Sequence, residues 1–188
     1  HGLLRERRFE ESRQALDVVS GFLPNHGNTV YLLRYYQGLL ARKTGDHRSA
    51  IEHLTLASKE ATRMQKPHLR RYSDQVLAHS LGMTGRLSDA IDLFEIGLSE
   101  LPVEDAGCSR LLLLNNFAWE MLIQLDGALM AEDRALIQKG RSISASLREA
   151  LVLARTTCKR YPDLEKNLLI NLALASLHDK KWEDARNF

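Results

Sequence analysis

The sequence predicts an all-α protein, built as a right-handed α-solenoid of antiparallel helix pairs. A small residue stands twelve positions before a proline three times, at Ser12 and Pro24, Ala90 and Pro102, and Ala150 and Pro162. Apolar residues follow the small residue at helical spacing. Aromatic residues make up only 6% of the chain and prolines number 4, which favours helix over sheet. An internal repeat of this kind indicates a repeat architecture, and this signal takes precedence over other sequence signals for the fold.

Each small residue follows a turn that is expected to end one helix and begin the next. Gly45 and Gly85 suit the position after a helix, where a positive φ costs glycine nothing. Ser, Asp or Glu then precedes the new helix, as capping and the helix dipole favour. The same frame predicts a turn over residues 179–185, before Ala185. The proline that closes each step is expected to stop a helix.

Helical stripes predict which residues of each helix face the core. The second helices of the first two complete units have stripes of four residues: Ala50, Ile51, Leu54 and Ala57, then Ala90, Ile91, Phe94 and Gly97. The first helices of four successive units have the following stripes: Val30, Leu33, Gly38 and Ala41; Leu77, Ala78 and Leu81; Leu114, Phe117, Ala118 and Met121; Leu169, Leu172, Ala173 and Ser176.

These residues resemble the tetratricopeptide repeat family. Ala90 and Phe94, followed by Pro102, match the second half of its pattern, and Gly38 with Ala41 matches the first half in a degenerate form. The steps between small residues are 38, 40, 60 and 35. The longer units of 38–40 residues resemble those of kinesin light chain and of signalling regulators.

The frame predicts one array over residues 1–188 with four to five units. These are a partial unit 1–26, units 27–66 and 67–104, unit 105–163 with an insertion at 124–147, and a partial unit 164–188. The insertion is expected to be a loop with a short amphipathic helix over 129–138. Because the chain starts and stops inside units, we expect it to be a piece of a longer protein.

Composition narrows the class of protein. The net charge of +2 argues against a dedicated nucleic-acid binder, and no apolar stretch is long enough to span a membrane. No signal peptide is visible, and Cys108 and Cys158 form no metal or redox motif, so both are expected to be free thiols in the cytoplasm. A basic cluster is interpreted as a solvated turn rather than a phosphate site, and its members are Arg63, Lys66, His68, Arg70 and Arg71.

No residue set points to catalysis. The seven histidines have no helper carboxylate at helical metal-site spacing, and neither a nucleophile elbow nor a glycine-rich phosphate loop occurs. The sequence therefore predicts no enzyme activity, no metal and no cofactor. It predicts a scaffold that binds a peptide or a neighbouring domain. The alternative is a regulatory or sensor segment that controls a protease, nucleotide-hydrolysing or DNA-binding domain of the same chain.

The resemblance implies that first helices line a concave groove that holds the partner. The residues projected onto that groove are Tyr35, Leu39, Arg42, Tyr72, Gln75, His79, Asn115, Asn116, Trp119, Asn167, Asn171 and His178. Asparagine amides suit a peptide backbone, and the aromatic rings suit anchor residues. Some chaperone-binding members hold a terminal carboxylate with a clamp of basic residues. Only Asn116 matches that clamp, so it is expected to be absent.

Overall fold

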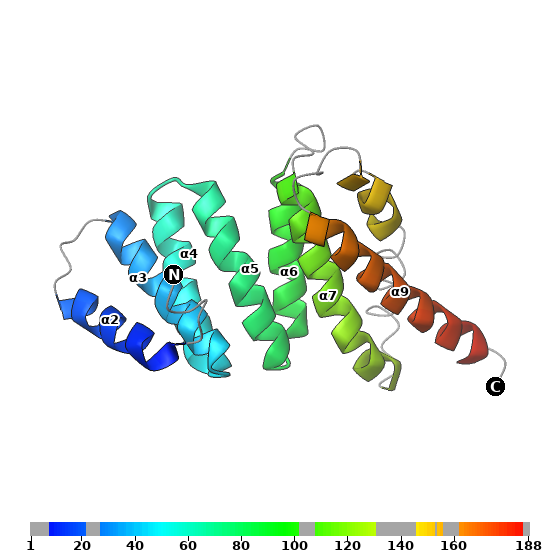
Figure 1. The fold of residues 1–188 in the computed structure, drawn as a ribbon, viewed down its shortest axis with the longest axis horizontal. Helices are drawn as coiled ribbons and strands as arrows, with labels where there is room; N and C mark the ends of the chain where they lie inside the picture. The colour runs from blue at the N-terminus through cyan, green and yellow to red at the C-terminus, as the bar shows by residue number, and fades with distance from the viewer. Residues whose placement is uncertain are drawn as a thin grey trace. The chain divides into compact units, whose positions relative to one another are not determined.

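The computed structural model describes residues 8–21, 27–101, 108–130, 146–152, 154–155 and 162–185. Within these ranges every regular element is an α-helix and no residue forms a strand (Figure 1). The prediction of an all-α protein is therefore confirmed for the described part of the chain. Contacts divide the chain into two compact units, residues 1–93 (unit 1) and 94–188 (unit 2).

In unit 1, helices α2 to α5 pack on one another in chain order. The helices of unit 1 are α2 (Phe9–Gly21), α3 (Gly27–Lys43), α4 (His47–Arg63), α5 (Pro67–Met83) and the start of α6 (Leu87–Ser99). Helix α3 packs on α2 and α4, α4 packs on α5, and α3 also touches α5. Three-residue turns join α3, α4, α5 and α6, so consecutive helices run antiparallel (Figure 1).

The three turns share one hydrogen-bond pattern. After α3, the amide of Asp46 donates to Ala41 O at 2.9 Å, and the turns after α4 and α5 repeat this bond at the same spacing. Gly45 and Gly85 have φ values of 83° and 79°, which confirms their predicted role. Gln65 occupies the corresponding position after α4 with φ 56°, although it is not glycine. The turns therefore recur every twenty residues, from the glycine at 45 to the one at 85.

Small residues let α3 and α4 approach closely. A Cβ atom added at Gly38 would lie 2.5 Å from Leu54 Cγ, so only glycine fits there. Ala50, Leu54 and Ala57 are fully buried, which confirms most of the predicted stripe of α4. The stripes predicted for α5 and α6 are also buried: Leu77, Ala78, Leu81, Ala90, Ile91, Phe94 and Gly97.

Unit 2 contains the end of α6, α7 (Cys108–Met130), helical residues 146–152 and 154–155, and α9 (Pro162–Ala185). The rings of Phe94 and Phe117 stack with centroids 5.2 Å apart, which joins α6 to α7. Helix α7 also packs on α9. Phe117, Ala118 and Met121 are buried as predicted, while Leu114 is half-buried.

The predicted core stripe of α9 is wrong by one residue. Its buried residues are Leu164, Leu168, Asn171 and Ala175. Leu169, which the sequence placed in the core, is 42% exposed, and Ala173 is exposed as well. The stripe was misplaced because its central member is a polar residue, Asn171, whose burial is made favourable by hydrogen bonds.

The predicted turn over 179–185 is also wrong. Helix α9 runs without a break through Ala185, since neither Gly nor Pro occurs between residues 163 and 185. Pro162 is the first residue of α9, where a missing N–H costs nothing. Pro67 begins α5 in the same way. The other two step-closing prolines, at 24 and 102, lie outside the described residues.

Two further predictions for unit 2 need correction. Helix α7 continues to Met130, so residues 124–130, the start of the predicted insertion, are helical and do not form a loop. At the other end of the predicted insertion, Leu147 is helical and fully buried. The predicted short helix over 129–138 lies mostly outside the described residues. Cys108 is disulfide-bonded and therefore not a free thiol, and Cys158, the only other cysteine, lies outside the described residues.

Candidate functional site

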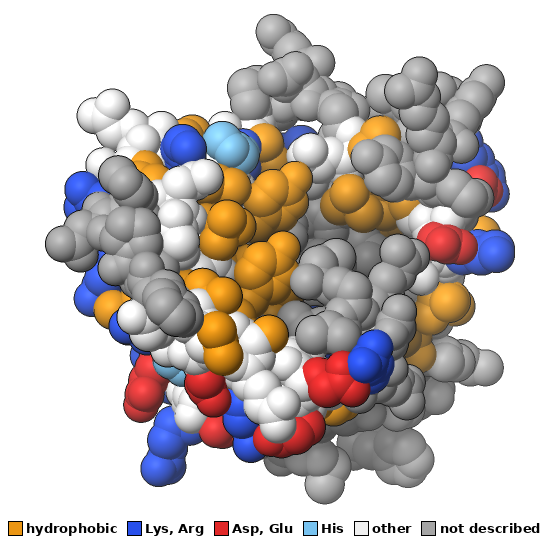
Figure 2. Space-filling view, turned by 60° about the vertical axis from the view of Figure 1, so that its left-hand side comes forward, with side chains coloured by type: hydrophobic (Ala, Val, Ile, Leu, Met, Phe, Trp, Pro, Cys, Tyr) orange, Lys and Arg blue, Asp and Glu red, His pale blue; other side chains and the backbone are white. Residues whose placement is uncertain are grey.

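The residues projected onto a partner-binding groove fall equally into the two units. Tyr35, Leu39 and Arg42 lie on α3, and Tyr72, Gln75 and His79 lie on α5, all in unit 1. The other six lie on α7 and α9 in unit 2. On the face drawn in Figure 2, hydrophobic side chains gather side by side, with Lys, Arg and His side chains near their upper edge and both acidic and basic side chains near their lower edge.

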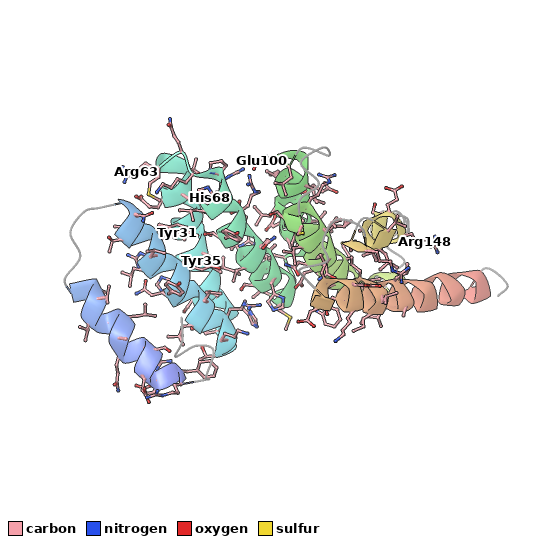
Figure 3. The ribbon with its side chains drawn as sticks, turned by 45° about the horizontal axis from the view of Figure 1, so that its top comes forward. Tyr31, Tyr35, Arg63, His68, Glu100 and Arg148 are labelled. Carbon is pink, nitrogen blue, oxygen red and sulfur yellow. The ribbon has the colours of Figure 1, made fainter. Side chains whose placement is uncertain are left out.

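A cluster of four tyrosines covers α3 and α5. The rings of Tyr31 and Tyr35 are stacked with centroids 5.8 Å apart, and Tyr36 meets Tyr35 edge-on at 5.6 Å. Figure 3 shows Tyr31 and Tyr35 one turn apart on α3. Tyr72 on α5 is the most exposed of the four, at 55%. This aromatic cluster contains four of the five tyrosines of the chain.

Hydrogen bonds fix the buried side of the cluster. The Tyr31 hydroxyl donates to Leu69 O at 3.1 Å and accepts from Ser73 Oγ at 3.5 Å, both on α5. Burial, followed by the neighbouring phenols of Tyr31, Tyr36 and Tyr72, raises the pKa of Tyr35 to about 12. Burial also raises the pKa of Tyr31, so the hydroxyls of Tyr31 and Tyr35 stay neutral at physiological pH.

The remaining predicted residues of unit 1 surround this cluster. Leu39, Arg42, Gln75 and His79 are all half-buried. The ring of His79 meets that of His47, at the start of α4, edge-on with centroids 6.0 Å apart. In unit 1 the six predicted residues thus lie on two helices in contact, α3 and α5. We call them, together with Tyr36 and His68, the α3–α5 surface.

In unit 2 the predicted asparagines separate into two kinds. Asn171 Nδ2 donates to both O and Oδ1 of Asn115, each at 3.0 Å, and these residues are only 2% and 6% exposed. This pair joins α9 to α7, so neither amide faces a partner. Asn116, Trp119 and Asn167 are exposed. Asn116 is therefore exposed and Asn171 buried, although the repeat alignment predicted the same repeat position for both. The His178 side chain lies outside the described ones.

The basic cluster at the α4–α5 turn has several partners within the chain. Arg63 binds Glu60 at 2.6 Å, and Lys66 Nζ donates to Asn28 Oδ1 at 3.2 Å. The Arg63 guanidinium holds the pKa of the Glu60 carboxyl below its usual range. These bonds agree with the interpretation of this segment as a solvated turn.

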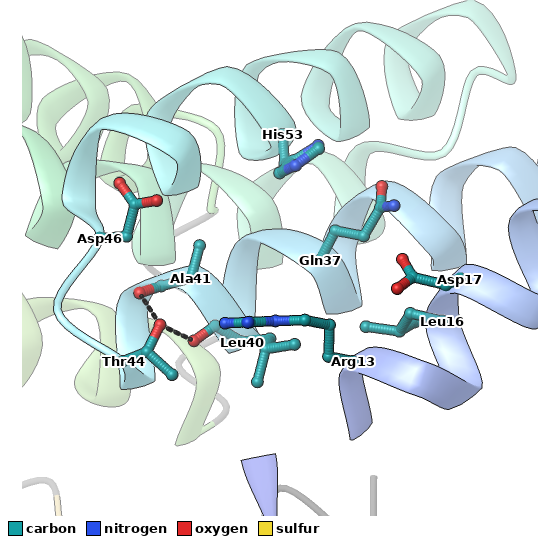
Figure 4. Close-up of a pocket in the computed structure, with 9 residues that line it drawn as sticks. All are labelled: Arg13, Leu16, Asp17, Gln37, Leu40, Ala41, Thr44, Asp46 and His53. Carbon is teal, nitrogen blue, oxygen red and sulfur yellow. Dashed lines mark hydrogen bonds between the residues drawn. The ribbon is translucent and has the colours of Figure 1, made fainter. Parts of the chain in front are cut away.

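Sequence reasoning missed a cavity of about 320 Å³ between α2, α3 and α4 (Figure 4). Its polar lining comes from Arg13, Asp17, Gln37 and His53 on the helices and from Thr44 and Asp46 in the α3–α4 turn. His53 Nδ1 is buried and makes no hydrogen bond, and burial lowers the pKa of this imidazole. No motif marks these residues, because they come from three helices and a turn. Sequence reasoning also missed Tyr31 and Tyr36. Tyr31 lies four residues before Tyr35, and Tyr36 lies four residues after Leu32, which is the spacing of neighbours on one helix face.

The described side chains contain no group of three or more His, Cys, Asp or Glu residues that could hold a metal ion. No helix in the described ranges has the length and apolar character needed to cross a bilayer. No family model, curated protein or solved structure matches the chain.

Proposed function

We propose that the chain is a protein-interaction module of the tetratricopeptide-repeat type, whose α3–α5 surface binds a peptide or a neighbouring domain. The proposed architecture is a right-handed superhelix of antiparallel helix pairs. Its support is the regular series of helices α3 to α6 with one turn geometry throughout. The predicted cytoplasmic setting loses the support of free thiols, because Cys108 is disulfide-bonded.

The exposed ring of Tyr72 is the observation that carries the binding proposal. Tyrosine is enriched among residues that dominate binding energy, because it buries a large area with few rotatable bonds. Here the exposed ring of Tyr72 lies on α5, to which the stacked pair of Tyr31 and Tyr35 is joined by the hydrogen bond from the Tyr31 hydroxyl to Leu69 O. Binding on an ordered surface loses little conformational entropy.

A random peptide library displayed on phage tests this function. The immobilised chain is expected to enrich peptides that Tyr72→Ala no longer retains. Leu56→Ala is the matched control, since Leu56 is 45% exposed on α4. Retention by the control variant and loss by Tyr72→Ala support the proposal. The proposal is wrong if no peptide is enriched, or if both variants retain the peptides equally.

A further inference from the structure

The cavity between α2, α3 and α4, which we call the α2–α4 cavity, has no role in the proposed function. Its nine lining residues include no member of the α3–α5 surface, and all of them belong to unit 1. Its volume of about 320 Å³ lies at the lower end of the range for ligand pockets, about 300–1,000 Å³. The cavity is therefore large enough for a small organic molecule.

The interior of the α2–α4 cavity is apolar and its rim is charged. The interior residues share an apolar side chain and low exposure, and they are Leu16, Leu40 and Ala41. Arg13, Asp17 and Asp46 are exposed. In the view of Figure 4 the Arg13 side chain extends from α2 toward the α3–α4 turn, which contains Asp46. A ligand that fits this lining has an apolar body and a charged end.

The rim presents charges of both signs. Arg13 contributes a guanidinium, and Asp17 and Asp46 contribute carboxylates. His53 adds no charge at neutral pH, because burial lowers the pKa of its imidazole. A simple anion would face two carboxylates, and a simple cation would face the guanidinium. A zwitterion, which has one group of each sign, matches the whole rim.

The charged groups of the rim keep the capacity to bind a ligand. Arg13 Nη1 lies 3.8 Å from Glu10 Oε2, and both side chains are more than half exposed, so this ion pair is weak. Asp46 Oδ1 accepts a hydrogen bond from Ser49 N at 3.1 Å. Because a carboxylate has about four acceptor sites, Asp46 can accept further hydrogen bonds from a ligand.

The neutral polar groups divide the lining into a donor side and an acceptor side. Gln37 Oε1 accepts from Arg34 Nη1 at 3.3 Å, which leaves the Gln37 Nε2 hydrogens as donors. The single hydroxyl hydrogen of Thr44 is shared by two carbonyl oxygens of α3, so this hydroxyl can only accept from a ligand. The turn with Thr44 and Asp46 therefore suits an ammonium group, while Arg13 and Gln37 suit a carboxylate.

We propose that the α2–α4 cavity binds a free amino acid with an aliphatic side chain. The aliphatic side chain packs in the apolar interior. The ammonium group binds at Asp46 and Thr44, and the carboxylate binds at Arg13 and Gln37. This site is separate from the α3–α5 surface, so the inference goes beyond the proposed function.

Isothermal titration calorimetry with related compounds tests the ligand class. The probe is L-leucine, for which we expect a dissociation constant of about 0.1 mM, since a ligand of so few atoms has a limited binding energy. Isoamylamine lacks only the carboxylate of leucine, and isocaproate lacks only its ammonium group. We expect each to bind at least about tenfold more weakly, because each loses charge-assisted hydrogen bonds. Glucose, which is neutral, is expected not to bind.

Matched variants assign the two ends of the ligand. Arg13→Gln should weaken leucine binding about tenfold and leave isoamylamine binding unchanged. Asp46→Asn keeps a capping side chain for α4, and it should weaken leucine binding about tenfold while isocaproate binding stays the same. The controls are Arg48→Gln and Asp92→Asn, which change exposed residues of α4 and α6 outside the lining and should leave leucine binding unchanged.

The comparison of ligands uses the wild-type chain and depends on no variant. The inference is wrong if leucine binds no more tightly than isoamylamine, isocaproate or glucose, or if its dissociation constant exceeds about 10 mM. It is also wrong if Arg13→Gln and Arg48→Gln bind leucine equally. Tyr72→Ala should bind leucine as the wild type does. Absence of leucine binding, with peptides still retained through Tyr72, would exclude the cavity ligand and leave the proposed function standing.

Discussion

The bond between Asn171 and Asn115 is expected to stabilise unit 2 and to take no part in partner binding. Asn171→Ala removes both 3.0 Å bonds and leaves Asn115 Oδ1 buried without its donor from α9. An unsatisfied buried polar group costs about 1–3 kcal/mol, and the truncated side chain leaves a small cavity. We therefore expect the free energy of unfolding to fall by about 2–4 kcal/mol.

Tryptophan fluorescence in urea measures this effect where it occurs. Both tryptophans, Trp119 and Trp182, belong to unit 2, so their emission reports on that unit. The control is Asn116→Ala, an exposed neighbour that is expected to change the free energy by less than about 0.5 kcal/mol. A double-mutant cycle with Asn115→Ala should give a coupling energy of about 1 kcal/mol or more.

The reasoning would be refuted by an Asn171→Ala variant that unfolds within about 0.5 kcal/mol of the wild type, or by additive effects in the cycle. Loss of peptide binding by a folded Asn171→Ala variant would instead indicate that the amide is a ligand, as the sequence first suggested. Normal peptide affinity together with lowered stability is the expected pair of results.

Further predictions concern the two units separately. Gln65→Gly should remove the strain of the positive φ and raise the free energy of unfolding by about 0.5–1 kcal/mol. A left-handed residue other than glycine costs about 1–2 kcal/mol, and the greater backbone entropy of glycine in the unfolded chain offsets part of this gain. An unchanged melting midpoint would argue against the turn geometry. Ala90→Glu, at a site only 1% exposed, should cost about 3 kcal/mol or more in urea unfolding. Burial lowers the pKa of His53, so the folded chain binds a proton on this imidazole less readily than the unfolded chain does. The free energy of unfolding should therefore fall as pH drops below about 6.5. His53→Gln should make the free energy of unfolding less dependent on pH between about pH 7 and 5. Non-reducing peptide mapping should find Cys108 linked to Cys158. Reduction should lower the free energy of unfolding by about 4 kcal/mol, because the disulfide closes a loop of about fifty residues. Alkylation of both thiols without prior reduction would contradict this.

Helical periodicity predicted the parts of the fold that depend on side-chain type. Ala50, Leu54 and Ala57 are apolar, small where helices meet, and buried. Gly45 and Gly85 were found because their residue type is specific to a positive φ. Gln65 takes the same backbone conformation without a specific residue type, so only its place in the twenty-residue series could have revealed it.

Sequence reasoning failed where burial depends on a partner far away in the chain. Asn171 lies in the core because it meets Asn115, which is 56 residues away. Neither residue shows this by itself, so both were assigned to the surface. The disulfide of Cys108 is hidden for a similar reason, since spacing alone does not distinguish a bonded cysteine from a free one. Because Asn171 is buried, the core face of α9 differs by one residue from the predicted one, and Leu169 is exposed.

On the candidate site, sequence reasoning placed six residues on α3 and α5, and these two helices touch. It missed Tyr31 and Tyr36, whose rings complete the cluster around Tyr35. A tyrosine in a helical stripe is usually interpreted as core. Whether its ring is buried or lies at an open edge depends on how closely the neighbouring helix approaches, and the sequence does not specify that distance.

Hydrogen–deuterium exchange with a library-selected peptide tests the central claim most directly. The account predicts slower exchange on peptide binding in residues 27–43 and 67–83, the helices of the α3–α5 surface, and no such effect in Tyr72→Ala. Protection confined to other described helices, or equal protection in the wild type and Tyr72→Ala, would contradict it.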